Sequence, residues 1–239
     1  MLYVACLVLA YFLGAIPTSY WIARRVAGID LREHGSGNLG ATNVFRTLGG
    51  WWGGLVLLLD MLKGAVPVLL MSVLLDARTA HAPLPLHLPP DVLRIAAGFV
   101  AAIGHTLSPF VGFHGGKGIS TTAGAFSVLA PYPLITVLVV WGIAFAFGRI
   151  VSLASLCSTI VLPVAVAFFE WRSESFSKTI FGFTLVIVVW VLFKHRANIR
   201  RLADGTESEL REGKRSSPQP PAPDAGADER RRTAKGGRS

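Results

Sequence analysis

Residues 52–75 read WGGLVLLLDMLKGAVPVLLMSVLL, an apolar run long enough to cross the hydrocarbon core of a bilayer as one helix. The run carries only two charged side chains, Asp60 and Lys63. The whole chain follows the same pattern, because 52% of its residues are hydrophobic, 15% are charged and its mean hydropathy is +0.53. Soluble domains usually carry about a quarter charged residues. The composition therefore predicts an integral membrane protein.

Further apolar runs lie on both sides of this segment, and together they predict an all-α, polytopic membrane helix bundle with about seven transmembrane segments. The predicted segments are residues 2–23, 52–75, 92–111, 118–131, 133–148, 150–170 and 178–194. The first lacks the cleavage site of a signal peptide, so we expect it to be retained. The fourth is short and rich in Gly, Ser and Thr. Residues 76–91 contain too much proline to continue a helix.

The basic residues predict how the bundle is oriented. Seven segments put the two termini on opposite sides, and one side then receives most of the arginines and lysines. This side carries Arg24, Arg25, Arg32, Arg46, Lys117, Arg149, Lys194, Arg196, Arg200 and Arg201. The positive-inside rule makes it cytoplasmic, with the N-terminus outside and the C-terminus in the cytoplasm. Joining the fourth and fifth segments into one would move Arg149 and the C-terminus outside, against this charge bias.

Hydrophobicity falls sharply after Gly205. Residues 208–239 are basic and rich in proline and cannot bury enough apolar surface to fold, so we predict a disordered cytoplasmic tail behind a membrane-embedded domain of residues 1–207. The formal net charge of +9 indicates contact with anionic lipid headgroups rather than with nucleic acid. Cys6 and Cys157 lie within apolar runs, which argues against a disulfide framework or a metal site.

Three polar islands interrupt the apolar chain on the predicted cytoplasmic side. The first, residues 33–46, lies in the stretch EHGSGNLGATNVFRTLGG. Its glycines let backbone N–H groups approach an anion closely, and Arg46 supplies a planar fork suited to phosphate. The candidate phosphate ligands of this island are Ser36, Gly37, Asn38, Gly40, Thr42, Asn43 and Arg46. For Ser36 and Asn38 alone, a role as a helix N-cap is equally open.

The second island, residues 104–118, ends in the glycine-rich stretch HGGKG. It differs from a P-loop, because Gly118 and not Ser or Thr follows Lys117 and no strand is expected before it. Its glycines bare the backbone, Lys117 adds a positive charge and a helix begins just afterwards, which together predict an anion site. His105 is a candidate proton acceptor near neutral pH, and a histidine simply hydrogen-bonded within the bundle is the open alternative.

Two further groups of polar residues accompany these islands. Asp60 and Lys63 are three residues apart and share one helix face, so they either form a mutually satisfied ion pair or line a polar cavity. The third island, residues 194–207, lies in KHRANIRRLADGTESE. A basic flank at the end of a membrane span explains Arg196 and Arg200 there, but it explains Asn198, Arg201 and Glu207 less well.

Four blocks of this sequence resemble the signatures of the bacterial acyl-phosphate:glycerol-3-phosphate acyltransferase family. The blocks are GSGNLGATNVFRTLG, DMLKGAVPV, GHTLSPFVGFHGGKGIST and HRANIRRLADGTE, and they occur in order within residues 1–207. The resemblance implies an inner-membrane enzyme that moves a fatty acyl group from acyl phosphate to the sn-1 hydroxyl of glycerol 3-phosphate. Its products would be lysophosphatidic acid and phosphate. None of the histidines begins the HxxxxD motif of the acyl-CoA-dependent and acyl-carrier-protein-dependent enzymes.

The resemblance also implies roles for individual residues. One phosphate-binding loop would contain Ser36, Asn38, Thr42, Asn43 and Arg46, and a second would contain Gly115, Gly116, Lys117, Gly118 and Thr121. Asn198 would orient a substrate, and Lys63 and Arg201 would add positive charge. Either His105 or the acyl phosphate itself would accept the proton of the attacking hydroxyl. The residues expected to be indispensable for catalysis are Ser36, Arg46, His105 and Lys117.

Acyl phosphate is a mixed anhydride with a good leaving group, so we expect no metal, cofactor or acyl-enzyme intermediate. Membrane lipid and an acyl-phosphate-producing enzyme are the expected partners. The competing interpretation is a secondary transporter or flippase of a phosphorylated solute or lipid, since broken helices with glycine-rich ends also suit that role. Two features count against it: the sequence shows no internal repeat, and all three islands fall on one side. A structural scaffold would leave the glycine-rich loops unexplained.

Overall fold

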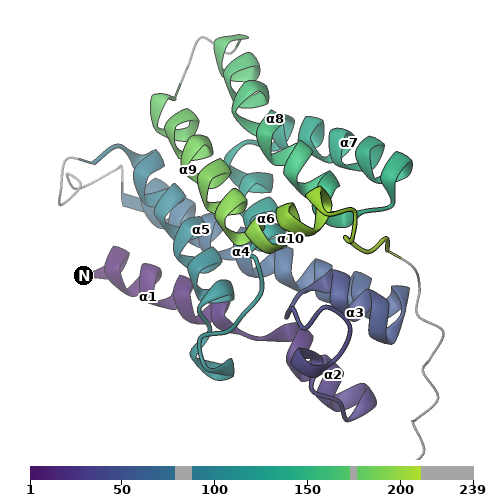
Figure 1. The fold of residues 1–239 in the computed structure, drawn as a ribbon. Coiled ribbons are helices and arrows are strands. Elements are labelled where there is room, and N and C mark those ends of the chain that lie inside the picture. The colour runs from purple at the N-terminus through teal and green to yellow at the C-terminus, as the bar shows by residue number, and fades with distance from the viewer. Residues whose placement is uncertain (79–87, 173–176, 211–239) are drawn as a thin grey trace, which may run out of the picture.

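The computed structural model describes residues 1–78, 88–172 and 177–210, and within these ranges it is helical without strands (Figure 1). The α-helices are α1 Leu2–Ala15, α2 Thr18–Ala27, α3 Ala41–Leu48, α4 Gly50–Arg78, α5 Pro90–Thr106, α6 Ile119–Leu129, α7 Pro131–Gly148, α8 Val151–Arg172, α9 Lys178–Lys194 and α10 Arg196–Ala203. Short 3₁₀ turns, η1 Leu31–Glu33 and η2 Pro109–Val111, precede α3 and α6. The all-α membrane bundle is confirmed.

The seven predicted segments all contain helix, but they differ in length. Within the described residues, five helices or helix pairs are long and apolar enough to cross a membrane. The bent pair α9 and α10, whose axes differ by 62°, makes a sixth if the two helices are taken as one span. The remaining segment, α6, has only 11 residues and packs between the longer helices α4 and α5. Its shortness agrees with the prediction for residues 118–131.

The first span is broken rather than continuous, and the break lies between α1 and α2. Pro17 has no N–H to donate and its ring obstructs a continuing helix, so helical hydrogen bonding stops before it. The backbone oxygens released there find side-chain donors. Ser108 Oγ donates to the carbonyl of Ala15 at 2.5 Å, and Lys63 Nζ donates to that of Ile16 at 2.9 Å. The apolar pattern of residues 2–23 predicted the span but concealed the break.

Close contact between α4 and α6 fixes where the second polar loop lies. A Cβ placed on Gly64 of α4 would collide with the backbone carbonyl of Thr121, and one on Gly124 of α6 would collide with that of Met61. Glycine at both positions lets the two backbones approach closely, as small residues do between membrane helices. The first turn of α6, and the loop that precedes it, are thereby held against α4 (Figure 1).

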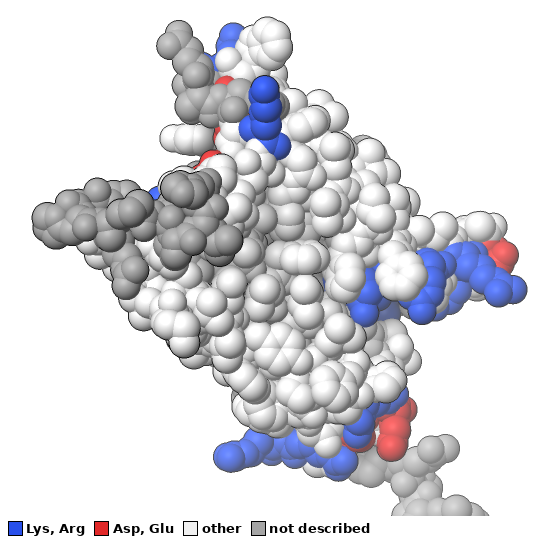
Figure 2. Space-filling view, turned by 90° about the vertical axis from the view of Figure 1, so that its left-hand side faces the viewer, with Lys and Arg blue, Asp and Glu red and all other residues white. Residues whose placement is uncertain are grey.

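Charged side chains gather at the ends of the bundle. Figure 2 shows a broad uncharged face with Lys, Arg, Asp and Glu confined to its edges. Apolar side chains such as Leu58, Val73 and Val189 are exposed on the helices, as expected for surfaces that face lipid. At the end opposite the three islands, Arg94 pairs with Asp76 at 3.3 Å.

The predicted disordered tail falls mostly outside the described residues, because residues 211–239 are not among them. Residues 208–210 are described and lie against the bundle. The Ser208 carbonyl accepts a hydrogen bond from Arg46 Nη2 at 3.0 Å, and the Leu210 N–H donates to the carbonyl of Arg149 at 2.7 Å. Contacts with the bundle therefore extend to Leu210, three residues past the predicted boundary at 207.

Candidate active site

The loop before α3 is organised by the side chain of Asn43, which is buried. Asn43 Oδ1 accepts a hydrogen bond from the N–H of Ser36 at 2.9 Å. Asn43 Nδ2 donates to the carbonyls of His34 at 2.9 Å and Leu31 at 3.2 Å. Gly37 turns the chain nearby with a φ of 68°. The amide of Asn43 is therefore occupied within the protein and braces the loop, whereas the sequence predicted a substrate ligand.

The other polar side chains of this loop lie nearer the surface. Ser36 is exposed, and Asn38 and Thr42 are half-buried. The N-cap position of α3 belongs to Gly40, so the alternative in which Ser36 or Asn38 caps this helix does not hold. Ser36 and Asn38 are therefore free of the capping role that competed with substrate binding.

The chain after α10 turns back over the site and brings the carboxylate of Glu207 into it. Arg201 Nε donates to Oε2 at 2.6 Å, while Asn198 Nδ2 and Ser152 Oγ donate to Oε1 at 2.6 and 2.7 Å. Lys117 Nζ in turn donates to Asn198 Oδ1 at 2.5 Å. Burial alone would raise the pKa of Glu207, but the hydrogen bonds from Arg201, Ser152 and Asn198 outweigh it and lower that pKa. An ionised carboxylate thus links the second and third islands.

Two cations lie beside this carboxylate. Burial lowers the pKa of Lys117 to about 8; Glu207 opposes this shift, and Arg201 and Arg46 add to it. Burial also lowers the pKa of Arg46. Arg46 Nη2 donates to the Ser208 carbonyl, whereas its Nε is buried without a hydrogen-bond partner among the described residues. A half-buried guanidinium with an unused donor is a natural partner for an anion.

The glycine-rich loop between η2 and α6 packs directly onto His105. The N–H of Gly115 donates to the carbonyl of Thr106 at 3.1 Å, and that of Gly116 donates to the carbonyl of His105 at 3.2 Å. A Cβ on Gly116 would collide with His105 Nε2. These two N–H groups are therefore used within the protein, and the glycines serve close packing rather than the backbone anion binding predicted for them. Lys117 follows immediately and carries the charge.

His105 is buried in a narrow polar crevice at the end of α5. The crevice has a volume of about 10 Å³ and is lined by His105, Ser108, Leu39, Gly116 and Lys63, among others. Such a volume holds about one water molecule. His105 Nδ1 lies 3.9 Å from Asp60 Oδ1, which is longer than a hydrogen bond. The ring thus has a carboxylate near one nitrogen and the glycine-rich loop against the other.

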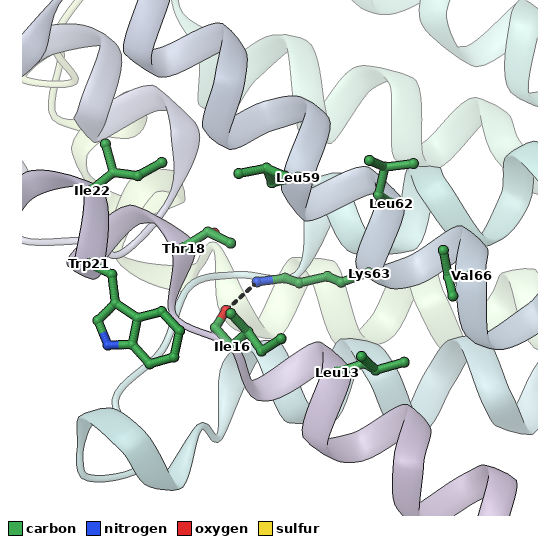
Figure 3. Close-up of a pocket in the computed structure, with 9 residues that line it drawn as sticks. All are labelled: Leu13, Ile16, Thr18, Trp21, Ile22, Leu59, Leu62, Lys63 and Val66. Carbon is green, nitrogen blue, oxygen red and sulfur yellow. Dashed lines mark hydrogen bonds between the residues drawn. The ribbon is translucent and has the colours of Figure 1, made fainter.

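A larger, apolar pocket of about 430 Å³ adjoins this crevice (Figure 3). Leu13 and Ile16 of the first span and Leu62 and Val66 of α4 are among its lining residues. Part of this lining faces outward, since Leu62 is 46% and the lining residue Trp21 47% exposed. The pocket therefore opens on the lipid-facing surface of the bundle.

Lys63 lies where the two cavities meet. It lines both of them, and Figure 3 shows its side chain crossing from α4 toward the carbonyl of Ile16 at the break in the first span. Lys63 Nζ also pairs with Asp60 Oδ1 at 2.8 Å, and both side chains are buried. The sequence left open whether Asp60 and Lys63 form an ion pair or line a polar cavity. Both are true, since the two side chains form an ion pair and Lys63 also lines both cavities.

Comparison with known proteins identifies the group to which this chain is related. The family model described as glycerol-3-phosphate acyltransferase matches residues 4–205. The chain belongs to this family. Among curated glycerol-3-phosphate acyltransferases, that of Desulforudis audaxviator is 43% identical over 202 residues, covering 84% of this chain and 91% of the relative. That of Chlorobium phaeobacteroides strain DSM 266 is 37% identical over 238 residues, covering 89% and 98%.

Solved structures of the glycerol-3-phosphate acyltransferase family share this fold. The crystal structure of PlsY, an integral membrane glycerol 3-phosphate acyltransferase in its glycerol 3-phosphate form, superimposes with a TM-score of 0.74 at 33% identity. The match covers 88% of this chain and 96% of that one. The lysophosphatidic acid form of PlsY gives a TM-score of 0.70 at 31% identity, over 87% and 95% of the two chains. The resemblance seen in the four sequence blocks is confirmed at the level of the family.

Most of the predicted site residues lie together at one end of the bundle. Thr121 is an exception, because it is fully buried in the contact between α4 and α6, and its hydroxyl has no partner among the described residues. Ser152 and His195 were missed by the sequence analysis. His195 is buried near Lys117, with its Nδ1 2.9 Å from the carbonyl of Val191. Its signal in the sequence was its place at the start of the block HRANIRRLADGTE, three residues before Asn198.

Proposed function

We propose that this chain transfers a fatty acyl group from acyl phosphate to the sn-1 hydroxyl of glycerol 3-phosphate, producing lysophosphatidic acid and phosphate. The observation that carries the proposal is the meeting of a cationic polar site with a lipid-facing apolar pocket at one lysine, Lys63. An amphipathic acyl donor needs both environments side by side. The acceptor is supported by the names of the relatives, and the donor by the resemblance of the four sequence blocks.

The cations of the site suit two phosphorylated substrates. Lys117 uses one of its three donors on Asn198, and Arg46 keeps a buried Nε without a partner among the described residues. Arg201 adds a third positive charge and pairs with the carboxylate of Glu207, which also accepts hydrogen bonds from Asn198 and Ser152. Charge-assisted hydrogen bonds from Lys117 and Arg46 would hold phosphate groups, and Ser36 at the exposed edge of the first loop would add a neutral donor.

The acyl chain of the donor would lie in the apolar pocket, with its phosphate end directed toward Lys63. The pocket walls are apolar side chains of α1, α2 and α4, so a hydrocarbon tail coming from the bilayer would find a similarly apolar environment there. Lys63 stands at the polar end, where the ammonium would favour negative charge that develops on the acyl carbonyl oxygen. In this arrangement the pocket would align the reacting carbon with the crevice that contains His105.

The reaction needs one bond formed and one broken. The hydroxyl oxygen of glycerol 3-phosphate bonds to the acyl carbonyl carbon, the bond from that carbon to the bridging phosphate oxygen breaks, and phosphate leaves with the electron pair. Two acceptors are at hand for the hydroxyl proton, His105 and the departing phosphate. Because phosphate is already a good leaving group, binding and orientation supply most of the required acceleration.

The proposed setting is the bacterial inner membrane, with the site on the cytoplasmic face and the N-terminus outside. The basic residues of the loops support this orientation. Acyl phosphate is reactive toward water, so a functional link to the enzyme that produces it would shorten its exposure. The proposal therefore includes a functional coupling between this chain and the enzyme that produces acyl phosphate.

The deciding experiment uses purified protein reconstituted in lipid without any other enzyme. Long-chain acyl phosphate is supplied with and without glycerol 3-phosphate, and inorganic phosphate and lysophosphatidic acid are measured. We expect both products only when both substrates are present. Acyl-CoA and acyl carrier protein donors are tested in parallel. Transfer from either of these donors but not from acyl phosphate would overturn the donor assignment, and no transfer from any donor would overturn the proposed function.

A further inference from the structure

The apolar pocket is elongated, and its two ends are formed by different helices. Figure 3 shows Trp21 and Ile22 of α2 at one end of the pocket. Leu13 of α1 and Val66 of α4 lie at the other end. Because the pocket opens on the lipid-facing surface, a void of about 430 Å³ there would deprive its lining of dispersion contacts. We therefore expect hydrocarbon from the bilayer to fill the pocket whenever no substrate occupies it.

Helix α2 continues beyond the pocket and carries an arginine on the same face. Thr18, Trp21 and Ile22 line the pocket. Arg25 follows Trp21 by four residues and Ile22 by three, so it shares their helix face and lies roughly 10 Å along the axis from Thr18. Exposed tryptophans of membrane proteins gather at the level of the lipid headgroups. One turn beyond Trp21, the guanidinium of Arg25 is therefore placed at the level of the lipid phosphates.

The two arginines of α2 differ in their partners. Arg24 donates to Asp30 Oδ2 at 3.3 Å, and its Cζ lies 5.6 Å from the ring centroid of Tyr20. Arg25 is exposed, and its side chain forms no ion pair or hydrogen bond with the residues that the structure describes. The C-terminal end of the helix dipole favours both arginines equally, so it does not account for this difference. The planar fork of Arg25 is thus available for a phosphate group.

We propose that the apolar pocket, when no acyl donor is bound, holds one acyl chain of an anionic glycerophospholipid whose phosphate is bound by Arg25. A zwitterionic lipid is a weaker ligand, because its own cationic group competes with Arg25 for the phosphate. The lipid site itself does not depend on the reaction. One consequence rests on the proposed function, namely that the lipid and the acyl donor use the same pocket and exclude one another.

Lipid binding can be measured directly on the full-length protein in detergent. Native mass spectrometry compares phosphatidylglycerol, which is anionic, with phosphatidylcholine carrying the same acyl chains. We expect one phosphatidylglycerol to be bound more tightly than phosphatidylcholine. Arg25→Gln should weaken phosphatidylglycerol binding about fivefold, the contribution of one basic residue at an anionic lipid surface, and change phosphatidylcholine binding less than about twofold. Equal binding of the two lipids, or an unchanged affinity in Arg25→Gln, would overturn the proposal.

Arg24→Gln is the matched control for this measurement. It removes the same charge from the neighbouring position, where the side chain is directed toward Tyr20 and Asp30. We expect Arg24→Gln to change the affinity for phosphatidylglycerol less than about twofold. Similar losses in Arg24→Gln and Arg25→Gln would indicate general attraction to a basic surface and contradict a site at Arg25.

Cross-linking tests whether the lipid tail enters the pocket and needs only the wild-type protein. Phosphatidylglycerol with a photoactivatable diazirine near the end of one acyl chain is added to phosphatidylcholine bilayers that contain the protein. We expect the strongest labelling at Leu13 and Val66, and weaker labelling at Val73, which is exposed on α4 away from the pocket lining. Labelling at the pocket no stronger than at Val73 would overturn the proposal, even if Arg25→Gln failed to fold.

Competition with the donor separates the lipid site from the proposed function. Long-chain acyl phosphate added without glycerol 3-phosphate should reduce the labels at Leu13 and Val66 but not at Val73. In kinetics at a fixed mole fraction of donor, phosphatidylglycerol should raise the KM for acyl phosphate relative to phosphatidylcholine, with kcat unchanged. An identical KM in both lipids would contradict the shared pocket. A protein without acyl transfer would sink the proposed function, whereas binding and cross-linking would still decide the lipid site.

Discussion

At the scale of single residues, the site depends on how its buried charges are balanced. Glu207 brings one negative charge into contact with Arg201 and, through Asn198, with Lys117. Without this carboxylate, the cations would repel one another in a half-buried setting. The positive charge of Arg46 is not fully balanced, because its Nε has no hydrogen-bond partner among the described residues. In the proposed reaction, the phosphate group of a substrate would complete the balance.

The pH dependence of substrate binding should follow Lys117. Burial lowers the pKa of this residue to about 8, so its ammonium is present below that pH and lost above it. We expect KM for glycerol 3-phosphate to be steady near pH 7 and to rise above pH 8, approaching roughly tenfold for each pH unit. Lys117→Arg should move this rise to higher pH, because arginine stays protonated. An identical rise in the Lys117→Arg variant would remove Lys117 as its cause.

Removing a cation altogether should weaken binding strongly. Lys117→Ala or Arg46→Ala each deletes a charge-assisted contact worth roughly 1.5–3 kcal/mol, which corresponds to about a 10- to 150-fold loss in kcat/KM. Lys178 lies at the start of α9, and the Lys178→Ala variant is the matched control. It should keep wild-type kinetics. Normal turnover in both site variants, with folding and membrane insertion verified, would exclude these residues from the site.

At the scale of elements, the position of the second loop depends on the contact between α4 and α6. Gly64→Ala would drive a methyl group into the backbone carbonyl of Thr121, which cannot move without shifting α6. We expect this substitution to cost roughly 1–3 kcal/mol and to lower the thermal unfolding temperature in detergent. Activity should fall with it, because α6 begins directly after Lys117 and Gly118.

Gly142 of α7 is the control for that substitution. Within the described part of the chain, a Cβ placed there would meet no heavy atom within 4 Å. Gly142→Ala should therefore leave the unfolding temperature unchanged or raise it slightly, since alanine favours helix by roughly 0.5–1 kcal/mol over glycine. Equal unfolding temperatures for the two variants would contradict the close approach of α4 and α6.

At the scale of the whole molecule, the site joins segments that are distant in the chain. Arg46 and Ser208, which are 162 residues apart, share a hydrogen bond. We predict that truncation after Leu210 preserves activity, whereas truncation after Gly205 abolishes it. The second truncation removes Glu207 and with it the counter-charge of Arg201 and Lys117. Acyl transfer and thermal unfolding measured on both truncations test this, and a fully active protein ending at Gly205 would contradict it.

Labelling can test the proposed orientation. Cys6 and Cys157 are first replaced by serine, and single cysteines are then introduced at the exposed positions Glu33, His114 and Arg200. We expect all three to react with a membrane-impermeant thiol reagent only from the cytoplasmic side. A cysteine at Asp76, at the other end of the bundle, should react only from outside. Labelling of Glu33 and His114 from opposite sides would exclude a single shared site.

The sequence predicted much of this organisation because apolar runs and polar islands are local signals. Length and hydropathy indicated the spans, and the spacing of Asp60 and Lys63 indicated their shared helix face. Partners set by tertiary packing had no such signal. The sequence predicted Asn43 to be a substrate ligand, but its side chain forms hydrogen bonds within its own loop. The sequence predicted that Gly116 helps to bind phosphate, but its missing side chain makes room for His105. The return of Glu207 across the site likewise depends on how α10 bends away from α9.

The sideways opening of the apolar pocket has a consequence for how substrate concentration is measured. Trp21, Leu62 and Val66 border this opening, so a long hydrocarbon tail would enter and leave within the plane of the bilayer and never cross water. Turnover would then follow the mole fraction of donor among the surrounding lipids, not its amount per volume. Diluting the donor with inert phospholipid should slow the reaction even when the total quantities of protein and donor stay fixed.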